Sequence, residues 1–265
     1  TEIYTLSLHD ALPILERLPA LEILAVFGVG YDGVPVDYCR ARGLRVTNTP
    51  EVLTDDVADI ATALVLMTAR RLAEAERFIR AGEWSGGAFP LARALRGKVA
   101  GIFGLGRIGA AIARRLEAHG MRIAYHGRRR QAVEHDYFPT LRELAAAADF
   151  LVVSCPGGAE TRHAVDAEVL AALGPEGTLI NIARGSVVDE AALVSALEAG
   201  TIRAAGLDVF ENEPHVPEAL LASPRTVLLP HVGSGTHETR MAMAALVVEN
   251  LAAHFAGRPL PTPVC

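Results

Sequence analysis

The chain has 265 residues, of which 51% are hydrophobic but only 5% aromatic, so its core must be built largely from aliphatic side chains. The net charge of −6 excludes a domain-wide basic surface for nucleic acid. The sequence shows no apolar run long enough to span a membrane, no secretory signal, and three scattered cysteines (Cys39, Cys155 and Cys265) without metal-ligand spacing. We therefore expect a cytoplasmic protein that binds no membrane, nucleic acid or metal.

The first long helical pattern runs from residue 54 to residue 81. Asp55 and Asp56 suit the first turn of a helix, because carboxylates are favoured near its N-terminus, and Gly82 suits its end. The following segment, 82–97, is too rich in Gly and Pro for a helix interior, and it carries the only Trp. We expect an extended arm here, and a plain surface loop is the alternative.

Apolar runs alternate with short helical patterns through the rest of the chain. Strands are expected over 99–103, 121–125, 151–153, 178–182, 204–209 and 227–229. Helices are expected over 108–119, 166–174 and 189–199, and a long one over 237–256 with Met241, Ala245, Val248 and Phe255 on one face. Strands that alternate with helices predict an α/β fold built on a doubly wound parallel sheet.

A glycine-rich turn, "GIFGLGRIG", follows the strand at 99–103 and opens the next helix. Gly104, Gly106 and Gly109 have the spacing G-x-G-x-x-G in the context that a dinucleotide-binding turn requires. Gly104 permits the turn, Gly106 lets the backbone approach the pyrophosphate, and Gly109 lets the helix pack close to the strand. The helix N-terminus offers free N–H donors to the phosphates. The pattern predicts dinucleotide binding, and a tight turn without a ligand is the alternative.

The stretch "YHGRRR", residues 125–130, ends the second strand of this unit. A carboxylate at this place would bind the ribose 2′-hydroxyl of NAD and would repel a 2′-phosphate. Gly127 removes that carboxylate, Arg128 can make a bidentate contact to a phosphate, and Arg129 or Arg130 can add a second contact. We expect NADPH to be preferred and NADH to bind more weakly. The alternative, which is favoured for Arg130, is a solvated surface charge.

Three further stretches each begin with a strand and end in a loop: "NIARGSVVDE" (181–190), "GLDVFENEP" (206–214) and "LPHVGSGT" (229–236). Loops at the carboxyl ends of parallel strands form the ligand crevice, so we expect Arg184, Glu213 and His231 at one edge of the sheet. An Arg can hold a carboxylate, a His can transfer a proton, and an acid can orient the His. Each of the three residues alone also fits an ordinary surface or structural role.

Taken together, these motifs resemble those of the D-isomer-specific 2-hydroxyacid dehydrogenase family. The matching stretches, in order, are "FGVGYDGVP", "NTPEVLTDDVAD", "GIFGLGRIG", "INIARGSVVDE", "GLDVFENEP" and "LPHVGSGT". The match runs from about residue 20 to the end of the chain. The ending "LLPHVGSGT" and the arginine after the second strand are most similar to the branch of hydroxypyruvate/glyoxylate and hydroxyphenylpyruvate reductases.

The resemblance implies an NAD(P)H-dependent oxidoreductase. It would reduce a small 2-oxo acid (hydroxypyruvate, glyoxylate or hydroxyphenylpyruvate) to a D-2-hydroxy acid. His231 would donate the proton, Glu213 would hold the ring of His231, and Arg184 would bind the substrate. The backbone amides of Val29 and Gly30 would also bind the substrate carboxylate.

The resemblance also implies which residues contact the cofactor, from the glycine-rich turn to the loop after the last strand. Asp208 has a second role open to it, since it can support the network of His231 and Glu213, and a purely structural role is a further alternative. The implied cofactor contacts are Gly104, Gly106, Arg107, Ile108, Gly109, Gly127, Arg128, Arg129, Cys155, Pro156, Thr161, Ile182, Ala183, Asp208, His231, Gly233 and Ser234.

Two domains are implied as well. A Rossmann-type NAD(P)-binding domain would cover 50–235, including a linking helix at 54–81 and a dimer arm at 82–97 that builds a homodimer. A smaller, incomplete flavodoxin-like substrate domain would comprise 1–49 and 236–265, because the family usually has a complete strand–helix unit before the G-V-G loop. Residues 1–14 resemble a translated sequencing adapter on a truncated reading frame and would then have no packing partner; a divergent N-terminus is the alternative.

Two rival functions remain open at this point. A dinucleotide-sensing binding protein, like the C-terminal binding protein corepressors, would share the fold and would retain the same residues. An inactive truncated fragment would lack part of the substrate pocket. Turnover of NADPH distinguishes the first rival from an enzyme, and a folding measurement on the purified chain tests the second.

Overall fold

The computed structural model describes residues 11–265, and the chain forms two compact units. The first unit contains the chain as far as Asp56 together with Ser234–Cys265, and the second contains Val57–Gly233. The chain therefore crosses between the units in the first turn of α3 (Thr54–Arg70), later than the boundary expected at residue 50. Among the described residues, no helix is both long enough and apolar enough to cross a lipid bilayer.

The first unit is built on a small parallel sheet of β1 (Ile23–Ala25) and β2 (Arg45–Thr47). Its other elements are α1 (Leu12–Glu16), α2 (Val36–Arg42) and α10 (His237–Phe255). The end of the chain pairs with β2, since the N–H of Val264 donates to the oxygen of Val46 at 2.7 Å. One cluster of buried apolar side chains in this unit consists of Ala11, Leu15, Val34, Cys39, Leu44 and Val46.

Part of the N-terminal segment 1–14 belongs to this core. Residues 1–10 of the segment 1–14 lie outside the described residues. Ala11, by contrast, is only 2% exposed, and its N–H donates to the oxygen of Gly33 at 3.0 Å. Residues 12–14 lie in α1. The expectation that 1–14 would have no packing partner is therefore wrong at least for Ala11.

Helix α10 turns a different face inward from the one that the sequence pattern indicated. Met243, Asn250 and Ala253 are buried, whereas Met241 and Phe255, on the expected apolar face, are 71% and 72% exposed. The reason is visible at Asn250, whose side-chain amide donates to the hydroxyl of Thr262 at 2.9 Å. A buried polar side chain with a hydrogen-bond partner thus helps to fix the inward face, which apolar periodicity alone did not predict.

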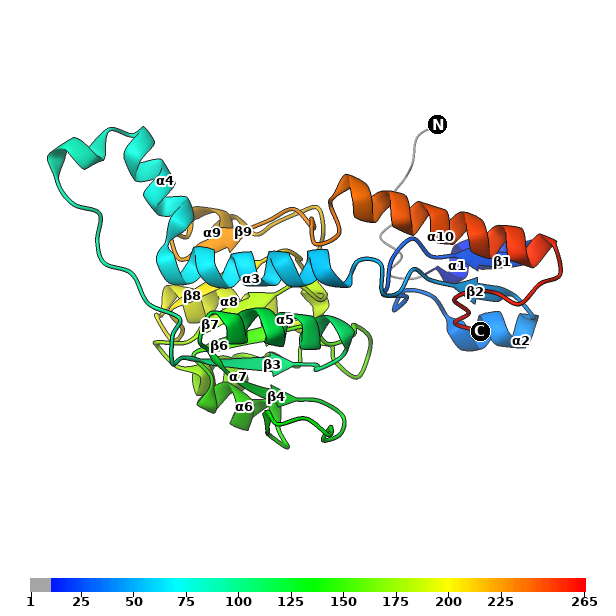
Figure 1. The fold of residues 1–265 in the computed structure, drawn as a ribbon, viewed down its shortest axis with the longest axis horizontal. Coiled ribbons are helices and arrows are strands. Elements are labelled where there is room, and N and C mark those ends of the chain that lie inside the picture. The colour runs from blue at the N-terminus through cyan, green and yellow to red at the C-terminus, as the bar shows by residue number, and fades with distance from the viewer. Residues whose placement is uncertain (1–10) are drawn as a thin grey trace. The chain divides into compact units, whose positions relative to one another are not determined.

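The second unit contains one parallel sheet in the strand order β5-β4-β3-β6-β7-β8-β9, whose strands are drawn in colours from green to orange in Figure 1. Its strands are β3 (Val99–Phe103), β4 (Arg122–His126), β5 (Asp136–Tyr137), β6 (Phe150–Val153), β7 (Thr178–Asn181), β8 (Ala204–Leu207) and β9 (Thr226–Leu228). The chain runs outward from β3 in one direction to β4 and β5, and in the other direction from β6 to β9. The sheet is therefore doubly wound, with its switch point between β3 and β6.

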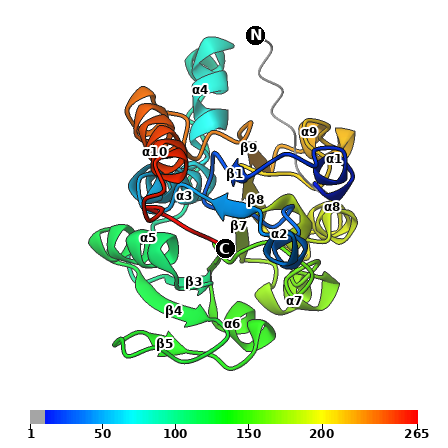
Figure 2. The same ribbon diagram turned by 90° about the vertical axis from the view of Figure 1, so that its right-hand side faces the viewer.

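Helices cover both faces of this sheet. Figure 2 shows α3 and α5 on one face, and α6, α7 and α8 on the other. After α3, the helices along the chain are α4 (Leu72–Arg80), α5 (Arg107–Ala118), α6 (Leu141–Ala147), α7 (Ala167–Leu173), α8 (Glu190–Glu198) and α9 (Glu218–Ala222). Apart from the helix expected over 54–81, the predicted strands and helices of this unit are present with small shifts at their ends, whereas β5, α6 and α9 were not predicted.

The helix expected over 54–81 is two helices. Helix α3 ends at Arg70, and α4 (Leu72–Arg80) follows after Arg71, whose φ of 53° is left-handed. A left-handed residue with a side chain cannot continue a right-handed helix, so the chain changes direction there. Beyond α4 the segment 82–97 contains a short 3₁₀ turn, η1 (Glu83–Gly86), and then an extended return to the sheet.

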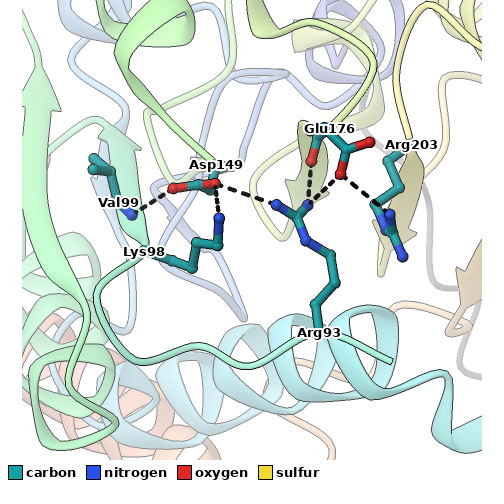
Figure 3. A network of polar contacts seen from close by, with 6 residues as sticks. All are labelled: Arg93, Lys98, Val99, Asp149, Glu176 and Arg203. Atoms are coloured by element: carbon teal, nitrogen blue, oxygen red, sulfur yellow. Dashed lines mark hydrogen bonds and ion pairs between the residues drawn. The ribbon is translucent and has the colours of Figure 1, made fainter. Parts of the chain in front are cut away.

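Charged side chains attach this returning segment to the amino edge of the sheet, as Figure 3 shows. The guanidinium of Arg93 lies 3.4 Å from the carboxylate of Asp149 and also donates to the backbone oxygen of Glu176. Lys98 lies 2.9 Å from the same carboxylate, which accepts the N–H of Val99 as well. Burial raises the pKa of Asp149, but these contacts outweigh it and leave the pKa below its ordinary value.

Candidate active site

The loops that follow the strands of the second unit carry the predicted site residues. Because the strands are parallel, their carboxyl ends meet at one edge of the sheet, where ligands bind in open α/β sheets. By the strand that each loop follows, the residues are Gly104, Gly106, Arg107, Ile108 and Gly109 after β3; Gly127, Arg128 and Arg129 after β4; Cys155, Pro156 and Thr161 after β6; Ile182, Ala183 and Arg184 after β7; Asp208 and Glu213 after β8; and His231 and Gly233 after β9.

The glycine-rich turn is shaped by close backbone approaches. Gly104 has a φ of 99°, and a Cβ built on it would lie 2.6 Å from the Cα of Cys155 in the loop after β6. A Cβ on Gly109 would lie 2.3 Å from the oxygen of Gly104. By contrast, a Cβ on Gly106 would meet no described atom within 4 Å. Gly104 and Gly109 are therefore required by packing, whereas Gly106 borders open space.

The N-terminus of α5, which this turn opens, fits a dinucleotide phosphate. Side chains cap the neighbouring helices α6, α7 and α8, through Thr140, Asp166 and Asp189. Helix α5 begins after Gly106, and no described side chain caps it. The first N–H groups of a helix lack partners within the helix, so those of α5 remain suited to an anion, and the helix dipole adds a partial positive charge.

The loop after β4 carries the arginines. Arg128, Arg129 and Arg130 are all exposed to solvent. A Cβ built on Gly127 would meet no described atom within 4 Å, so the glycine leaves room at the end of the strand. The next residues of the chain fold back toward β4, where the backbone N–H of Gln131 donates to the hydroxyl of Tyr125.

The loop after β6 adds an apolar wall rather than a reactive thiol. Burial raises the pKa of Cys155 to about 12, so its side chain is a neutral thiol at physiological pH. Thr161 shapes the same loop, since its hydroxyl donates to the oxygen of Pro156 at 2.7 Å. Neither residue has the environment of a nucleophile, and their contact to the cofactor stays a prediction.

Arg184 is held by its own loop after β7. Its guanidinium donates to the oxygen of Ala183 at 2.7 Å, and its backbone oxygen accepts the side-chain amide of Asn181 at 2.9 Å. The oxygen of that Asn181 side chain accepts the N–H of Ala183 at 3.0 Å. Asn181 is 1% exposed and thus fixes the turn that presents Arg184. Asn181 was not among the predicted site residues, although a polar residue in an apolar strand was a visible signal.

Asp208 fixes the loop after β9. Its carboxylate accepts the N–H of Val232 and the N–H of Gly233, each at 2.8 Å, and its backbone oxygen accepts the N–H of His231 at 2.9 Å. Burial raises the pKa of Asp208 above its ordinary value, although the two amides partly offset the burial. Its contacts support the role of holding the loop that carries His231.

His231 and Glu213 form a hydrogen-bonded pair. Nδ1 of His231 lies 2.8 Å from Oε2 of Glu213, and the other carboxylate oxygen accepts the N–H of Phe210 at 3.1 Å. The φ of His231 is 54°, a left-handed conformation that is uncommon for a residue other than glycine. The side chain of His231 is 51% exposed, so its ring is accessible to a reactant.

The charge of Glu213 is stabilised within this pair. Burial raises the pKa of Glu213, but the hydrogen bond and charge of His231, the N–H of Phe210 and the nearby Arg184 lower it by more. The net result is a pKa below the ordinary value, so Glu213 is ionised at neutral pH. An ionised carboxylate on Nδ1 fixes the tautomer of the ring and leaves Nε2 available for proton transfer.

Three predicted site residues lie in the first unit. Val29 and Gly30 follow β1, and the oxygen of Val29 accepts the side-chain amide of Asn48 at 2.9 Å. Ser234 was expected in the cofactor domain, but it belongs to the first unit. The chain leaves the first unit after Asp56 and re-enters it at Ser234. Close to these two points, the hydroxyl of Thr236 donates to the carboxylate of Asp56, and this hydrogen bond lies within the first unit.

Known proteins share this arrangement of strands, loops and motifs. Residues 62–233 match the family described as "D-isomer specific 2-hydroxyacid dehydrogenase, NAD binding domain". Over 252 residues, the chain is 53% identical to a glyoxylate/hydroxypyruvate reductase A of Arabidopsis thaliana, covering 95% of this chain and 80% of the relative. It is also 53% identical to a hydroxyphenylpyruvate reductase of Plectranthus scutellarioides, with the same coverage.

A solved structure matches equally well. An NADPH-dependent glyoxylate/hydroxypyruvate reductase of Sinorhizobium meliloti, in complex with NADP and malonate, is 58% identical. The superposition has a TM-score of 0.93 and covers 96% of this chain and 81% of the other. The match in sequence and in fold, at this coverage, assigns the family: the chain belongs to the D-isomer-specific 2-hydroxyacid dehydrogenases.

Proposed function

We propose that the chain is an NADPH-preferring reductase that converts small 2-oxo acids, such as glyoxylate, hydroxypyruvate or hydroxyphenylpyruvate, to D-2-hydroxy acids. The observation that carries this proposal is the pair of His231 and Glu213, joined at 2.8 Å at the same sheet edge as the glycine-rich turn. The relatives from Arabidopsis, Plectranthus and Sinorhizobium, which are named as reductases of these acids, support it.

Binding of the substrate is assigned to three residues. The guanidinium of Arg184 pairs with the substrate carboxylate, because its planar fork matches a carboxylate in a bidentate manner. The backbone amides of Val29 and Gly30 bind the same carboxylate. Fixing this group orients the neighbouring carbonyl carbon, and orientation removes much of the entropic cost of reaction.

Proton transfer is assigned to His231. When bound, a reduced nicotinamide would supply the hydride that the carbonyl carbon accepts, so that negative charge would develop on the carbonyl oxygen. Nε2 of His231 donates a proton to that oxygen, while Glu213 holds Nδ1 and stabilises the positively charged ring before transfer. Asp208 holds the backbone of the loop, so the ring stays in position.

The test of this function is a rate comparison on the purified chain. Glyoxylate, hydroxypyruvate, phenylpyruvate and hydroxyphenylpyruvate are supplied with NADPH or NADH, and oxidation of the cofactor is followed by absorbance. We expect turnover of at least one acid, and a product with the D configuration on chiral analysis. Tight cofactor binding without turnover of any acid would instead favour a dinucleotide-sensing protein.

Cofactor preference is assigned to the loop after β4, where Gly127 presents no carboxylate and Arg128 and Arg129 are exposed. Arg128→Ala should raise the Kd for NADPH by about ten- to a hundredfold, because a hydrogen bond to a charged group is worth roughly 1.5–3 kcal/mol. The Kd for NADH should change little. Gly127→Asp should weaken NADPH and improve NADH, since the new carboxylate can accept from the 2′-hydroxyl.

Fluorescence titration of each reduced cofactor measures these constants. The preference for NADPH should also shrink as salt is raised, because exposed charges are screened. An equal loss of affinity for both cofactors in Arg128→Ala would mean that the arginine supports the fold or the adenine. That result would contradict the assignment of Arg128 to the 2′-phosphate.

A homodimer built by the arm at 82–97 is part of the proposal. No residue of α4 or η1 is buried, and the apolar side chains of Ile79, Trp84 and Leu91 are 53%, 65% and 96% exposed. Exposed apolar side chains on a projecting segment are typical of an interaction surface. Sedimentation should give twice the chain mass, and Leu91→Glu should shift the protein toward a monomer; a monomeric parent chain would contradict the proposal.

The proposal also covers the roles of the two units and the cellular location of the protein. The second unit would bind the cofactor and the first unit would bind the substrate. Cys39, Cys155 and Cys265 are all free thiols, which supports a reducing compartment such as the cytoplasm. Localisation of a tagged full-length protein by cell fractionation tests this, and recovery in an oxidising compartment would contradict it.

A further inference from the structure

The loop after β4, residues 127–131, is called the arginine loop here, and polar contacts hold it at both ends. The proposed function assigns no role to these contacts. Gln131 closes the loop, and two of its groups make contacts. Its backbone N–H donates to the hydroxyl of Tyr125 at 2.7 Å, and its side-chain amide donates to the backbone oxygen of Leu105, also at 2.7 Å. Tyr125 is fully buried in β4, and Leu105 lies inside the glycine-rich turn. Gln131 therefore joins the arginine loop to the glycine-rich turn.

The other end of the loop is held by a second tyrosine. The hydroxyl of Tyr137 donates to the oxygen of Gly127 at 3.4 Å, and the rings of Tyr125 and Tyr137 lie 5.3 Å apart on the paired strands β4 and β5. The two ends of the segment 127–131 are therefore hydrogen-bonded to the hydroxyls of two neighbouring tyrosines. The arginines between them are exposed to solvent.

The geometry of the ligand explains why such a connection is useful. The pyrophosphate and the ribose 2′-phosphate belong to one molecule, so their separation is limited by covalent bonds. A protein that binds both anions must hold its two binding elements at a matching separation. If the arginine loop were flexible, the entropy lost when the loop becomes ordered would offset part of the binding free energy. The direct contact between Gln131 and Leu105 holds the two elements together.

We propose that Gln131 is a positioning residue for cofactor selection, which sets the arginine loop against the glycine-rich turn and thereby strengthens binding of the 2′-phosphate. This rests on the proposed NADPH preference. NADH lacks the 2′-phosphate and does not use the arginines, so its affinity does not depend on the position of the loop. Gln131 touches neither cofactor in this account and acts through Arg128.

The decisive variant is Gln131→Met, which keeps the length of the side chain and removes its N–H donor. A single hydrogen bond of this kind corresponds to about a two- to tenfold change in affinity, so the Kd for NADPH should rise by that factor. The Kd for NADH should stay the same. Gln131→Glu, whose carboxylate would face the oxygen of Leu105, should have a larger effect in the same direction.

A double-mutant cycle tests whether Gln131 acts through Arg128. If it does, adding Gln131→Met to Arg128→Ala should weaken NADPH no further than Arg128→Ala alone. Additive losses would overturn the proposal. Hydrogen exchange of the amides in 127–131, measured without cofactor, should be faster in Gln131→Met than in the parent chain, and unchanged exchange would also overturn it.

The outcomes separate this inference from the proposed function. Equal losses for NADPH and NADH in Gln131→Met, or no loss for either, would overturn the positioning role while leaving the result for Arg128 untouched. Equal losses for both cofactors in Arg128→Ala would overturn the phosphate assignment itself. Gln131 is exposed, so Gln131→Met should fold, and thermal unfolding of each variant provides the check.

Discussion

Replacing His231 with asparagine is expected to lower kcat by about a hundred- to ten-thousandfold, the range that general acid catalysis supplies. The ring is proposed to donate a proton only when negative charge develops on the carbonyl oxygen. The variant should therefore bind NADPH as the parent chain does. Asparagine is chosen because it tolerates the left-handed conformation, with a φ of 54°, that His231 adopts. The amide of asparagine cannot serve as the acid.

Steady-state rates with the best 2-oxo acid and a fluorescence titration of NADPH measure the two effects. His163 provides a matched control, because it also has a left-handed φ, of 50°, and its Nε2 lies 2.7 Å from the carboxylate of Glu211. His163→Asn should leave kcat nearly unchanged. A folded His231→Asn variant with the turnover of the parent chain would refute the assignment of the acid.

The fold of the second unit could be predicted because its signals are local. The predicted strands there are short, mostly apolar runs, and Asp166 and Asp189 do cap α7 and α8 as the pattern indicated. The edge that gathers the loops then follows from parallel strands. Local patterns failed where tertiary contacts decide, as at Arg71, whose left-handed conformation divides the long helix.

The candidate reacting groups could be selected from the sequence, whereas the contacts that hold them could not. Arg184, Glu213 and His231 were visible because their residue types suit the chemistry and each follows a strand. The supporting contacts were not predicted, since Asn181 and Gln131 donate to backbone oxygens, and a pattern of residue types does not show which backbone oxygen a side chain reaches. Gln131 and Leu105 are far apart in the chain, and only the pairing of β3 with β4 brings their loops together.

Gly185→Ala is expected to damage both the stability and the activity of the protein. A Cβ on Gly185 would lie 1.9 Å from the carbonyl carbon of Phe210 and 2.3 Å from the nitrogen of Glu211. These are backbone atoms, which cannot rotate away, so the loop of Arg184 must move from the segment that leads to Glu213. Overpacking of this kind typically costs about 1–3 kcal/mol, and thermal or denaturant unfolding measures the loss.

The activity should fall for the same reason, because Arg184 and the pair of Glu213 and His231 would no longer keep their separation. Gly106→Ala is the matched control, since its Cβ meets no described atom within 4 Å. Both substitutions restrict the unfolded chain equally, so this contribution cancels when the two variants are compared. Gly106→Ala should keep its stability and lose affinity for NADPH, because the pyrophosphate is expected to approach that backbone. Gly185→Ala should lose stability, and equal stability of the two variants would show that the loops after β7 and β8 do not pack as closely as the structure places them.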